Sequence, residues 1–435
     1  MKMMTYLLNL RISWIKNIEK EIYISFFGKS INKSFNPEKY KIKGIYGENG
    51  SGKSAIITAV EIVKEFIFDD NYLRDSHKQL LLKELINKKS NELYFRCEFV
   101  TNIETRYIFE YEVKLVIDNN SNEINVANES LKYKINSSEN KQRTIFNCAF
   151  GEFLELNLDE DLNRIIKLKT LNLLIKQSAL GTVFFIIGKD DKHRMPRQWL
   201  YSVIFFLSLF TFCDKGDTHM DYYNKRRIEG LKKSNHSSEV LLKELWNSIN
   251  TFDSKISISD YSAYEKKVKR LEKFVRLFKP DLKKIDIEKK ENNGFYECEL
   301  LFDYGDYRVN KEFESTGIKK IIDIYYALVL ASNGAIVFID ELDSNINDIY
   351  LCKIIEYFNL YGEGQLCFTS HNTDPMLVLK DNNKSIDFIS RDNLIVPWVK
   401  NGHYSADSSY KNGMIMGLPF NIESSDFIGV FVGEE

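Results

Sequence analysis

The 435-residue chain has little proline, few cysteines and no excess of charge of either sign. It contains 6 prolines and 6 cysteines, 44% hydrophobic and 28% charged residues, and a formal net charge of −2. Scarce proline beside abundant phenylalanine and tyrosine argues against a disordered tail and for long helices and a strand-rich part. The balanced charge excludes a chain that is basic throughout, so a surface for nucleic acid or an acidic membrane must be a local patch.

The cysteines form no close pair, and no histidine lies near them at zinc-ligand spacing. We therefore expect free thiols in a reducing compartment rather than disulfides or a metal site. They are Cys97, Cys148, Cys213, Cys298, Cys352 and Cys367.

Long hydrophobic runs are also missing. The longest, 199–213, is too short to span a bilayer and predicts a buried helix. Arg11 and Lys16 interrupt the apolar residues near the N-terminus, and no small-residue cleavage site follows them, so no signal peptide is indicated. We expect a cytoplasmic protein with no membrane partner.

One glycine-rich stretch, here called the phosphate loop, organises the rest of the sequence. It lies between an apolar run that predicts a strand (41–46) and another that predicts a helix (55–68). This arrangement turns successive backbone N–H groups toward a phosphate at a helix N-terminus. Its residues are Gly47, Glu48, Asn49, Gly50, Ser51, Gly52, Lys53 and Ser54.

The phosphate loop predicts a nucleoside triphosphate as ligand, and a glycine turn before an ordinary helix is the alternative. Lys53 is expected to reach the β- and γ-phosphates, and the Ser54 hydroxyl to ligate Mg²⁺.

The pattern of the remaining chain predicts one parallel-sheet domain split by an insertion. Apolar and polar residues alternate in an antiparallel meander after the first helices, and the pattern is largely helical from 162 to 280, apart from the apolar run 182–188. Strands and helices alternate again toward the C-terminus. The expected meander strands are 93–100, 106–117 and 130–135, the insertion helices 195–213, 221–233, 238–250 and 261–278, and the later strands 295–302, 335–339 and 365–369.

Lysine and arginine dominate the second half of the insertion, over 221–284. Such a run is typical of a solvated helix face, and a surface for nucleic acid or a partner protein is the other interpretation. The sequence leaves both open.

The strand over 335–339 is fully apolar and ends in Asp340 and Glu341. A buried parallel strand delivers such residues to the edge of the sheet where the phosphate loop lies. Asp340 is then expected to hold Mg²⁺, and Glu341 to act as general base on the attacking water. The alternative is a strand that happens to end in two surface acids.

Two further segments have polar residues at the ends of predicted elements. His371 follows the strand 365–369, where it is expected to hydrogen-bond the γ-phosphate and the attacking water. Ser315 and Gly317 precede an apolar helix, and by spacing alone they predict a helix cap.

Together these motifs resemble the ABC-type ATPases of the SMC/RecF/OLD-like class. More narrowly, the chain is similar to the AAA-type ATP-binding proteins of prokaryotic anti-phage, or abortive-infection, systems. The segments that carry the resemblance are 10–27, 47–54, 314–320 and 339–343. It implies an α/β fold, an ABC-type P-loop head of a parallel core sheet and a β meander, with a helical lobe inserted. The expected domains are the N-terminal part of the head (1–160), the helical lobe (161–284) and the C-terminal part of the head (285–435).

The resemblance also implies site residues and partners. Ser315 and Gly317 would be the residues that complete the ATP site of a second copy, so that a homodimer or larger oligomer forms through composite sites. Thr316 and Ile318 depart from the Leu-Ser-Gly-Gly-Gln of transporters. Gln177 would be the lobe-linking glutamine that senses Mg²⁺. The implied cofactors are ATP and Mg²⁺.

The leading hypothesis is therefore an ATP-hydrolysing switch in anti-phage defence that controls a separate effector protein. Only about 60 residues follow His371, which is too few for a nuclease domain. A RecF- or SMC-like repair ATPase that contacts DNA through the basic helices of 221–284 is one alternative. A nucleotide-dependent scaffold that hydrolyses slowly is another. The altered Ser-x-Gly segment argues against a transporter subunit.

Overall fold

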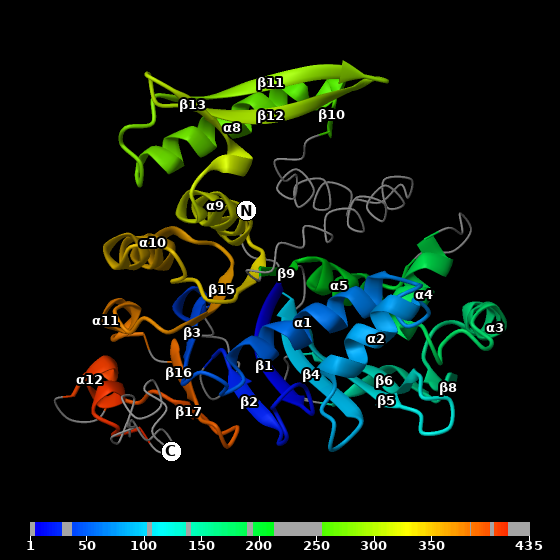
Figure 1. Ribbon diagram of the computed structural model, residues 1–435. Coiled ribbons are helices and arrows are strands. Elements are labelled where there is room, and N and C mark those ends of the chain that lie inside the picture. The colour runs from blue at the N-terminus through cyan, green and yellow to red at the C-terminus, as the bar shows by residue number, and fades with distance from the viewer. Residues whose placement is uncertain are drawn as a thin grey trace, which may run out of the picture.

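The structure is a computed structural model, and it describes residues 5–27, 37–101, 107–135, 141–188, 195–212, 255–382, 384–400 and 404–415 (Figure 1). The helices expected over 221–233 and 238–250, Cys213, and the tail after residue 415 lie outside these ranges. The other five cysteines are free, as expected. Within the part that is described, no helix is both long and apolar enough to cross a membrane.

A six-stranded sheet forms the centre of the fold, in the order β17-β16-β3-β15-β14-β9. All neighbours in it are parallel except β16 and β17. The inner strands are apolar and buried on both faces, as parallel sheets require. The bounds are β3 Ile42–Tyr46, β9 Leu209–Phe212, β14 Ile336–Ile339, β15 Gln365–Ser370, β16 Ile386–Ile389 and β17 Ile395–Pro397.

A seven-stranded antiparallel sheet lies beside it, in the order β2-β1-β4-β5-β6-β7-β8. The expected meander is confirmed, and the two N-terminal strands add to its edge. The bounds are β1 Thr5–Ser13, β2 Ile22–Ser25, β4 Glu92–Thr101, β5 Tyr107–Ile117, β6 Ile124–Ile135, β7 Arg143–Ala149 and β8 Glu152–Leu156.

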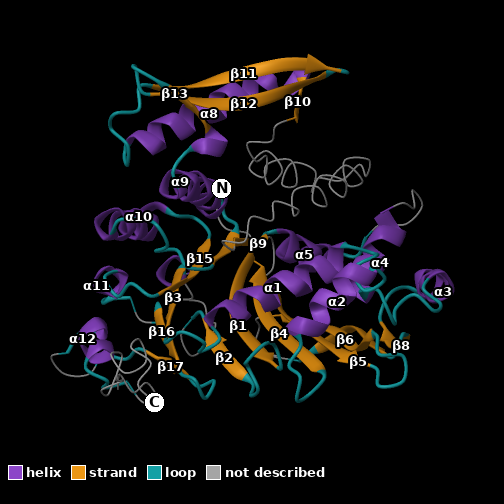
Figure 2. Ribbon diagram, viewed as in Figure 1, coloured by secondary structure: helices purple, strands orange, loops and turns teal. Residues whose placement is uncertain are grey.

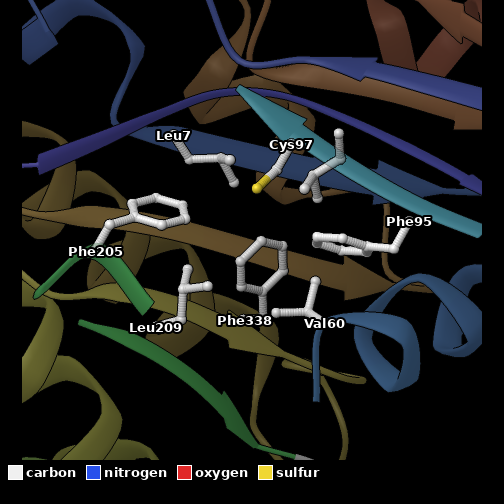
Figure 3. Close-up of a pocket in the computed structure, with 8 residues that line it drawn as sticks. Leu7, Val60, Phe95, Cys97, Phe205, Leu209 and Phe338 are labelled. Atoms are coloured by element: carbon white, nitrogen blue, oxygen red, sulfur yellow. The ribbon is translucent and has the colours of Figure 1, made fainter. Parts of the chain in front are cut away.

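Helices cover both sheets and share one hydrophobic core with them. The ring of Phe99 on β4 stacks on that of Phe205 on α5, with centroids 3.8 Å apart. Figure 3 shows Leu7, Val60 and Phe338 converging between the two sheets around an apolar space too small for a water molecule. The bounds are α1 Lys53–Phe68, α2 Ser76–Leu85, α3 Glu160–Lys169, α4 Ala179–Gly188, α5 Arg197–Leu207, α9 Thr316–Ser332, α10 Asp348–Tyr361, α11 Pro375–Leu379 and α12 Ala406–Lys411, with 3-10 turns η1 Pro37–Tyr40 and η3 Lys311–Phe313.

A small lobe has a core of its own. Figure 2 shows it as a sheet with one helix beneath, set apart from the two larger sheets. Its elements are β10 Lys255–Ser257, η2 Ile258–Asp260, α8 Tyr261–Arg276, β11 Lys284–Asn292, β12 Phe295–Asp303 and β13 Arg308–Asn310. The expected domain boundary at 284/285 therefore falls inside this lobe, which combines a helix with a sheet.

Two predictions for apolar runs were wrong. The run 182–188 belongs to helix α4, and the run 199–213 is helix α5 only as far as Leu207. After Ser208, residues 209–212 form β9, because they pair in parallel with β14, Leu209 opposite Ile336. An uninterrupted apolar run does not distinguish a buried helix from a buried strand, so pairing decides.

Helix α4 packs against the end of α1 at Gly181, and this contact leaves no room for a side chain. A β-carbon on Gly181 would lie 1.8 Å from the carbonyl oxygen of Ile67. We expect Gly181→Ala to lower the free energy of unfolding by about 3 kcal/mol, since the helices must separate. Urea denaturation followed by circular dichroism measures the change.

The matched control is Gly188→Ala at the other end of the same helix, where a β-carbon would meet nothing within 4 Å. This variant should be as stable as the wild type or slightly more stable, because alanine favours a helix over glycine. Equal losses in the two variants would contradict the close contact.

Candidate functional site

The phosphate loop runs from the end of β3 into α1, and at Gly52 the backbone has a left-handed conformation that favours glycine. Gly52 is the N-cap of α1 and has φ 106° and ψ 11°. That conformation turns the chain so that the first N–H groups of α1 point out of the helix end, where an anion binds. Next to it, the Ser51 hydroxyl is buried with no hydrogen-bond partner among the described residues. The loop can therefore hold phosphate.

The Lys53 ammonium lies inside this loop. It donates to the carbonyl oxygens of Gly47 at 2.7 Å and Glu48 at 2.9 Å. Burial lowers the pKa of Lys53, and nearby carboxylates act in the opposite direction. Those carboxylates belong to Asp340, Glu341, Asp343 and Glu48. The structure thus brings the lysine of the loop and the acids after β14 to one place.

Thr369, the last but one residue of β15, connects the two acids. Its hydroxyl donates to Asp340 Oδ1 at 2.6 Å and accepts from the backbone N–H of Glu341 at 2.8 Å. Glu341 has φ 47°, a left-handed conformation that is uncommon outside glycine. One buried hydroxyl therefore fixes both the orientation of the Asp340 carboxylate and the backbone turn that presents Glu341.

Asp343 holds the segment that carries His371. Its Oδ2 accepts from the backbone N–H groups of His371 at 3.1 Å and Asn372 at 3.0 Å. The Asn372 amide in turn donates to Asp348 Oδ1 at 2.5 Å, at the start of α10. The side chain of His371 is exposed at the same edge of the sheet as Asp340 and Glu341.

Two ion pairs connect the phosphate loop and its strand with β16 and the turn after it. Lys43 on β3 and Asp387 on β16 lie 2.9 Å apart and are each 1% exposed. Burial raises the pKa of Asp387, and the Lys43 ammonium opposes that shift. At the surface, Arg391 Nε lies 2.6 Å from Glu48 Oε2. The loop is therefore connected on one side to the acids and on the other to the β16–β17 turn.

Ser315 caps α9, as its spacing predicts. Its hydroxyl accepts from the N–H of Ile318 at 3.3 Å, and the residue is exposed. A β-carbon on Gly317 would lie 3.3 Å from the carbonyl oxygen of Asn345, in the segment after β14. Ser315 and Gly317 therefore lie beside that segment at the start of α9.

Gln177 does not lie at the phosphate loop. Its amide donates to the carbonyl oxygen of Asp70 at 3.0 Å, beyond the C-terminal end of α1. Ser54 is at the other end of this 16-residue helix, about 24 Å away. The expectation that Gln177 is a metal ligand is corrected. Its side chain instead hydrogen-bonds the backbone just after α1, away from the phosphate loop.

No cluster of three or more His, Cys, Asp or Glu side chains that could hold a metal exists among the described residues. A Mg²⁺ ion bound with a nucleotide needs no such cluster, because phosphates and water supply most of its ligands. Ser54 and Asp340 offer the oxygen donors that such an ion takes.

Part of this region matches a known family. Residues 200–374, less than half of the chain, match the family model described as "AAA domain, putative AbiEii toxin, Type IV TA system". The matched region contains β14, β15 and the acids and histidine that follow them. This match supports an ATPase.

Solved structures and curated proteins add little to this assignment. Two structures of "the recombination mediator protein RecF", RecF-ATPrS and RecF-ATP, are 10% and 12% identical to this chain. They cover 92% of it and 99% of their own chains, with TM-scores of 0.37 and 0.38. Likeness at this level establishes no property of this ATPase. No curated protein matches it.

Thr369 and Asp343 are the site residues that the sequence did not reveal. Both act through hydrogen bonds to residues 28 or 29 positions away. No local pattern marks them. In the segment 369–371, the sequence predicted a role for His371 only.

We expect Thr369→Val to lower kcat by about 10- to 100-fold, because Asp340 and the Glu341 turn lose their common partner. The affinity for ATP should change little, since the Thr369 hydroxyl forms its hydrogen bonds with Asp340 and Glu341 and not with the phosphate loop. Steady-state ATPase assays and binding of a fluorescent ATP analogue separate the two effects. Thr369→Ser keeps the hydroxyl and is the control, so a loss of similar size in this variant would contradict the interpretation.

Proposed function

We propose that this ATPase is a switch that assembles with a second copy of itself around ATP. Each nucleotide lies between the phosphate loop of one copy and Ser315 and Gly317 of the other. The observation that supports this is the placement of Ser315, which is exposed at a helix start and forms its hydrogen bonds with Glu314, Ile318 and Lys319 rather than with the loop of its own chain. A helix N-terminus open to solvent favours an anion such as the γ-phosphate.

In this site each acid has a separate role. Asp340, oriented by Thr369, holds Mg²⁺ together with Ser54. Glu341 accepts a proton from the attacking water, and His371 donates a hydrogen bond to the γ-phosphate. The charge pattern supports a metal, because Lys53 is surrounded by carboxylates that would repel the phosphates of an unaccompanied nucleotide.

The biological role that we propose is control of a separate effector in prokaryotic defence. The description of the matched family, a toxin of a type IV toxin–antitoxin system, supports this context. ATP binding then favours the assembled state and hydrolysis releases it, so nucleotide state sets whether the effector is engaged.

Glu341→Gln should trap the assembled state. The variant keeps Asp340 and the loop but lacks the general base, so ATP binds and is not hydrolysed. We expect a dimer or larger oligomer that forms only with ATP and Mg²⁺, measured by size exclusion with light scattering. An oligomer that ignores both nucleotide and mutation would contradict the composite site.

Mixing two inactive variants tests the same proposal. Lys53→Ala removes the loop lysine, and Ser315→Arg blocks the exposed helix start. A mixture should regain about a quarter of wild-type ATPase activity, because half of random pairs carry one intact site of two. If each copy hydrolyses ATP alone, the mixture stays inactive or Ser315→Arg is active by itself.

A nucleic-acid-dependent ATPase is the second candidate, and one surface of the small lobe favours it. Four cations recur at helical spacing on the exposed face of α8, over about 10 Å. Among the described residues, none of them forms an ion pair with a carboxylate. They are Lys266, Lys269, Arg270 and Lys273. Exposed cations in a row match the phosphates of a duplex, which carries one charge per ~1.7 Å.

Replacing Lys266, Lys269 and Lys273 by glutamine should weaken duplex DNA binding and reduce the slope of log affinity against log salt by about 2 to 3. Fluorescence anisotropy over a salt series measures both. The control makes the same charge change on α3, with Arg164, Lys167 and Lys169, which are also exposed. Equal effects of the two triple variants would assign the binding to net charge rather than to α8.

A further inference from the structure

The turn between β12 and β13 connects the small lobe to the start of helix α9. Tyr304 lies in this turn, and its ring is buried in the core of the small lobe. Its hydroxyl donates to Glu314 Oε1 at 2.7 Å, and Glu314 is the residue directly before Ser315. A buried tyrosine has few accessible rotamers, so its hydroxyl fixes the position of the carboxylate that it binds.

The turn that carries Tyr304 is itself held in place. The backbone N–H of Gly305 donates to Asp303 Oδ1 at 2.7 Å, and Arg308 Nε donates to Asp303 Oδ2 at 3.1 Å. The ring of Tyr307 stacks on that of Tyr304, with centroids 5.0 Å apart. One carboxylate and one stacked ring therefore order the turn from both of its ends.

Glu314 links this turn to Ser315. Its Oε2 accepts from the backbone N–H of Ser315 at 3.2 Å, while its Oε1 is bound by Tyr304. Burial, together with the hydrogen bond to the Glu314 carboxylate, raises the pKa of Tyr304, so the phenol stays protonated and remains a donor at neutral pH. Both oxygens of this carboxylate are thus engaged, one by the small lobe and one by the helix start.

We propose that Tyr304 is a positioning residue, which through Glu314 holds Ser315 in the orientation that meets the γ-phosphate bound to a second copy. The inference rests on the composite site proposed above and adds the small lobe to it. A shift of the β12–β13 turn moves Ser315, and it therefore slows hydrolysis at the phosphate loop of the partner copy rather than at its own. A misplacement of about 1 Å in such a site can reduce the rate by about 100-fold.

Tyr304→Phe removes only the hydroxyl and should lower kcat about tenfold, because Glu314 and Ser315 lose their fixed position. Binding of a fluorescent ATP analogue, measured in the Ser315→Arg background where pairs are blocked, should not change. The control Tyr307→Phe removes a hydroxyl from the neighbouring ring, which is 55% exposed, and should keep wild-type activity.

Two variants of Glu314 separate position from charge. Glu314→Gln keeps an oxygen that accepts from Tyr304 and should retain most of the activity, whereas Glu314→Ala should lose as much as Tyr304→Phe. A loss in Glu314→Gln as large as that in Tyr304→Phe would assign the effect to the charge and overturn the positioning role.

Mixed pairs test whether Tyr304 acts on the partner copy. In the mixture of Lys53→Ala and Ser315→Arg, the one intact site combines the loop of the Ser315→Arg copy with Ser315 of the Lys53→Ala copy. Adding Tyr304→Phe to the Lys53→Ala copy should lower the activity of the mixture about tenfold, and adding it to the Ser315→Arg copy should not lower it.

Equal losses from the two additions, or no loss from either, overturn the proposal, because Tyr304 would then act within its own copy or not at all. A mixture of the two parent variants that has no activity contradicts the composite site itself. The role of Tyr304 at the partner's phosphate would fail with it. ATPase assays on the parent mixture therefore distinguish failure of the composite site from failure of the positioning role.

Discussion

The parallel pairing of β3, β15 and β14 is the constraint on which the site depends. In a parallel sheet all strands end at the same edge. The loop after β3, the histidine after β15 and the acids after β14 therefore all lie at that edge. The three strands come from opposite ends of the sequence, residues 42–46 and 336–370. Folding of the two halves against each other and formation of the site are therefore one event.

The edge that results is rich in acid and depends on a few hydrogen bonds for its order. One lysine faces four carboxylates, and Thr369 and Asp343 each hold two groups of neighbouring segments. Such an arrangement keeps negative charges close together. It lowers stability unless cations bind among the carboxylates when the phosphates bind. This arrangement supports the proposed Mg²⁺, which would enter with the nucleotide and compensate the carboxylates.

The sequence predicted the parts of this site that are local. The phosphate loop, the apolar strand before Asp340 and Glu341, and the cap at Ser315 are each complete within a few residues, so pattern and spacing suffice. Their roles in catalysis and assembly stay predictions. Thr369 could not be found in this way, because its partners belong to another strand and only the register brings them together.

The same reasoning explains the errors. Residues 209–212 form a strand because β14 offers an open edge, which no property of the run itself reveals. Gln177 was assigned through the family resemblance, but α1 places it a helix length from Ser54. The small lobe was expected to be helical and to end at 284, whereas the alternating residues after 284 complete its sheet.

Helix α9 belongs to two cores at once. Its first turns, with Ile318 and Ile322, pack into the small lobe, and its later turns, with Ala327 and Leu330, pack into the main core. A helix that is packed into two cores couples them rigidly, because neither end of the helix can shift without moving the other. A tilt of the small lobe therefore shifts Ser315 and Gly317 at the start of α9, and it also shifts β14, which follows the end of α9. The small lobe and the strand that ends at Asp340 are therefore connected through the seventeen residues of α9.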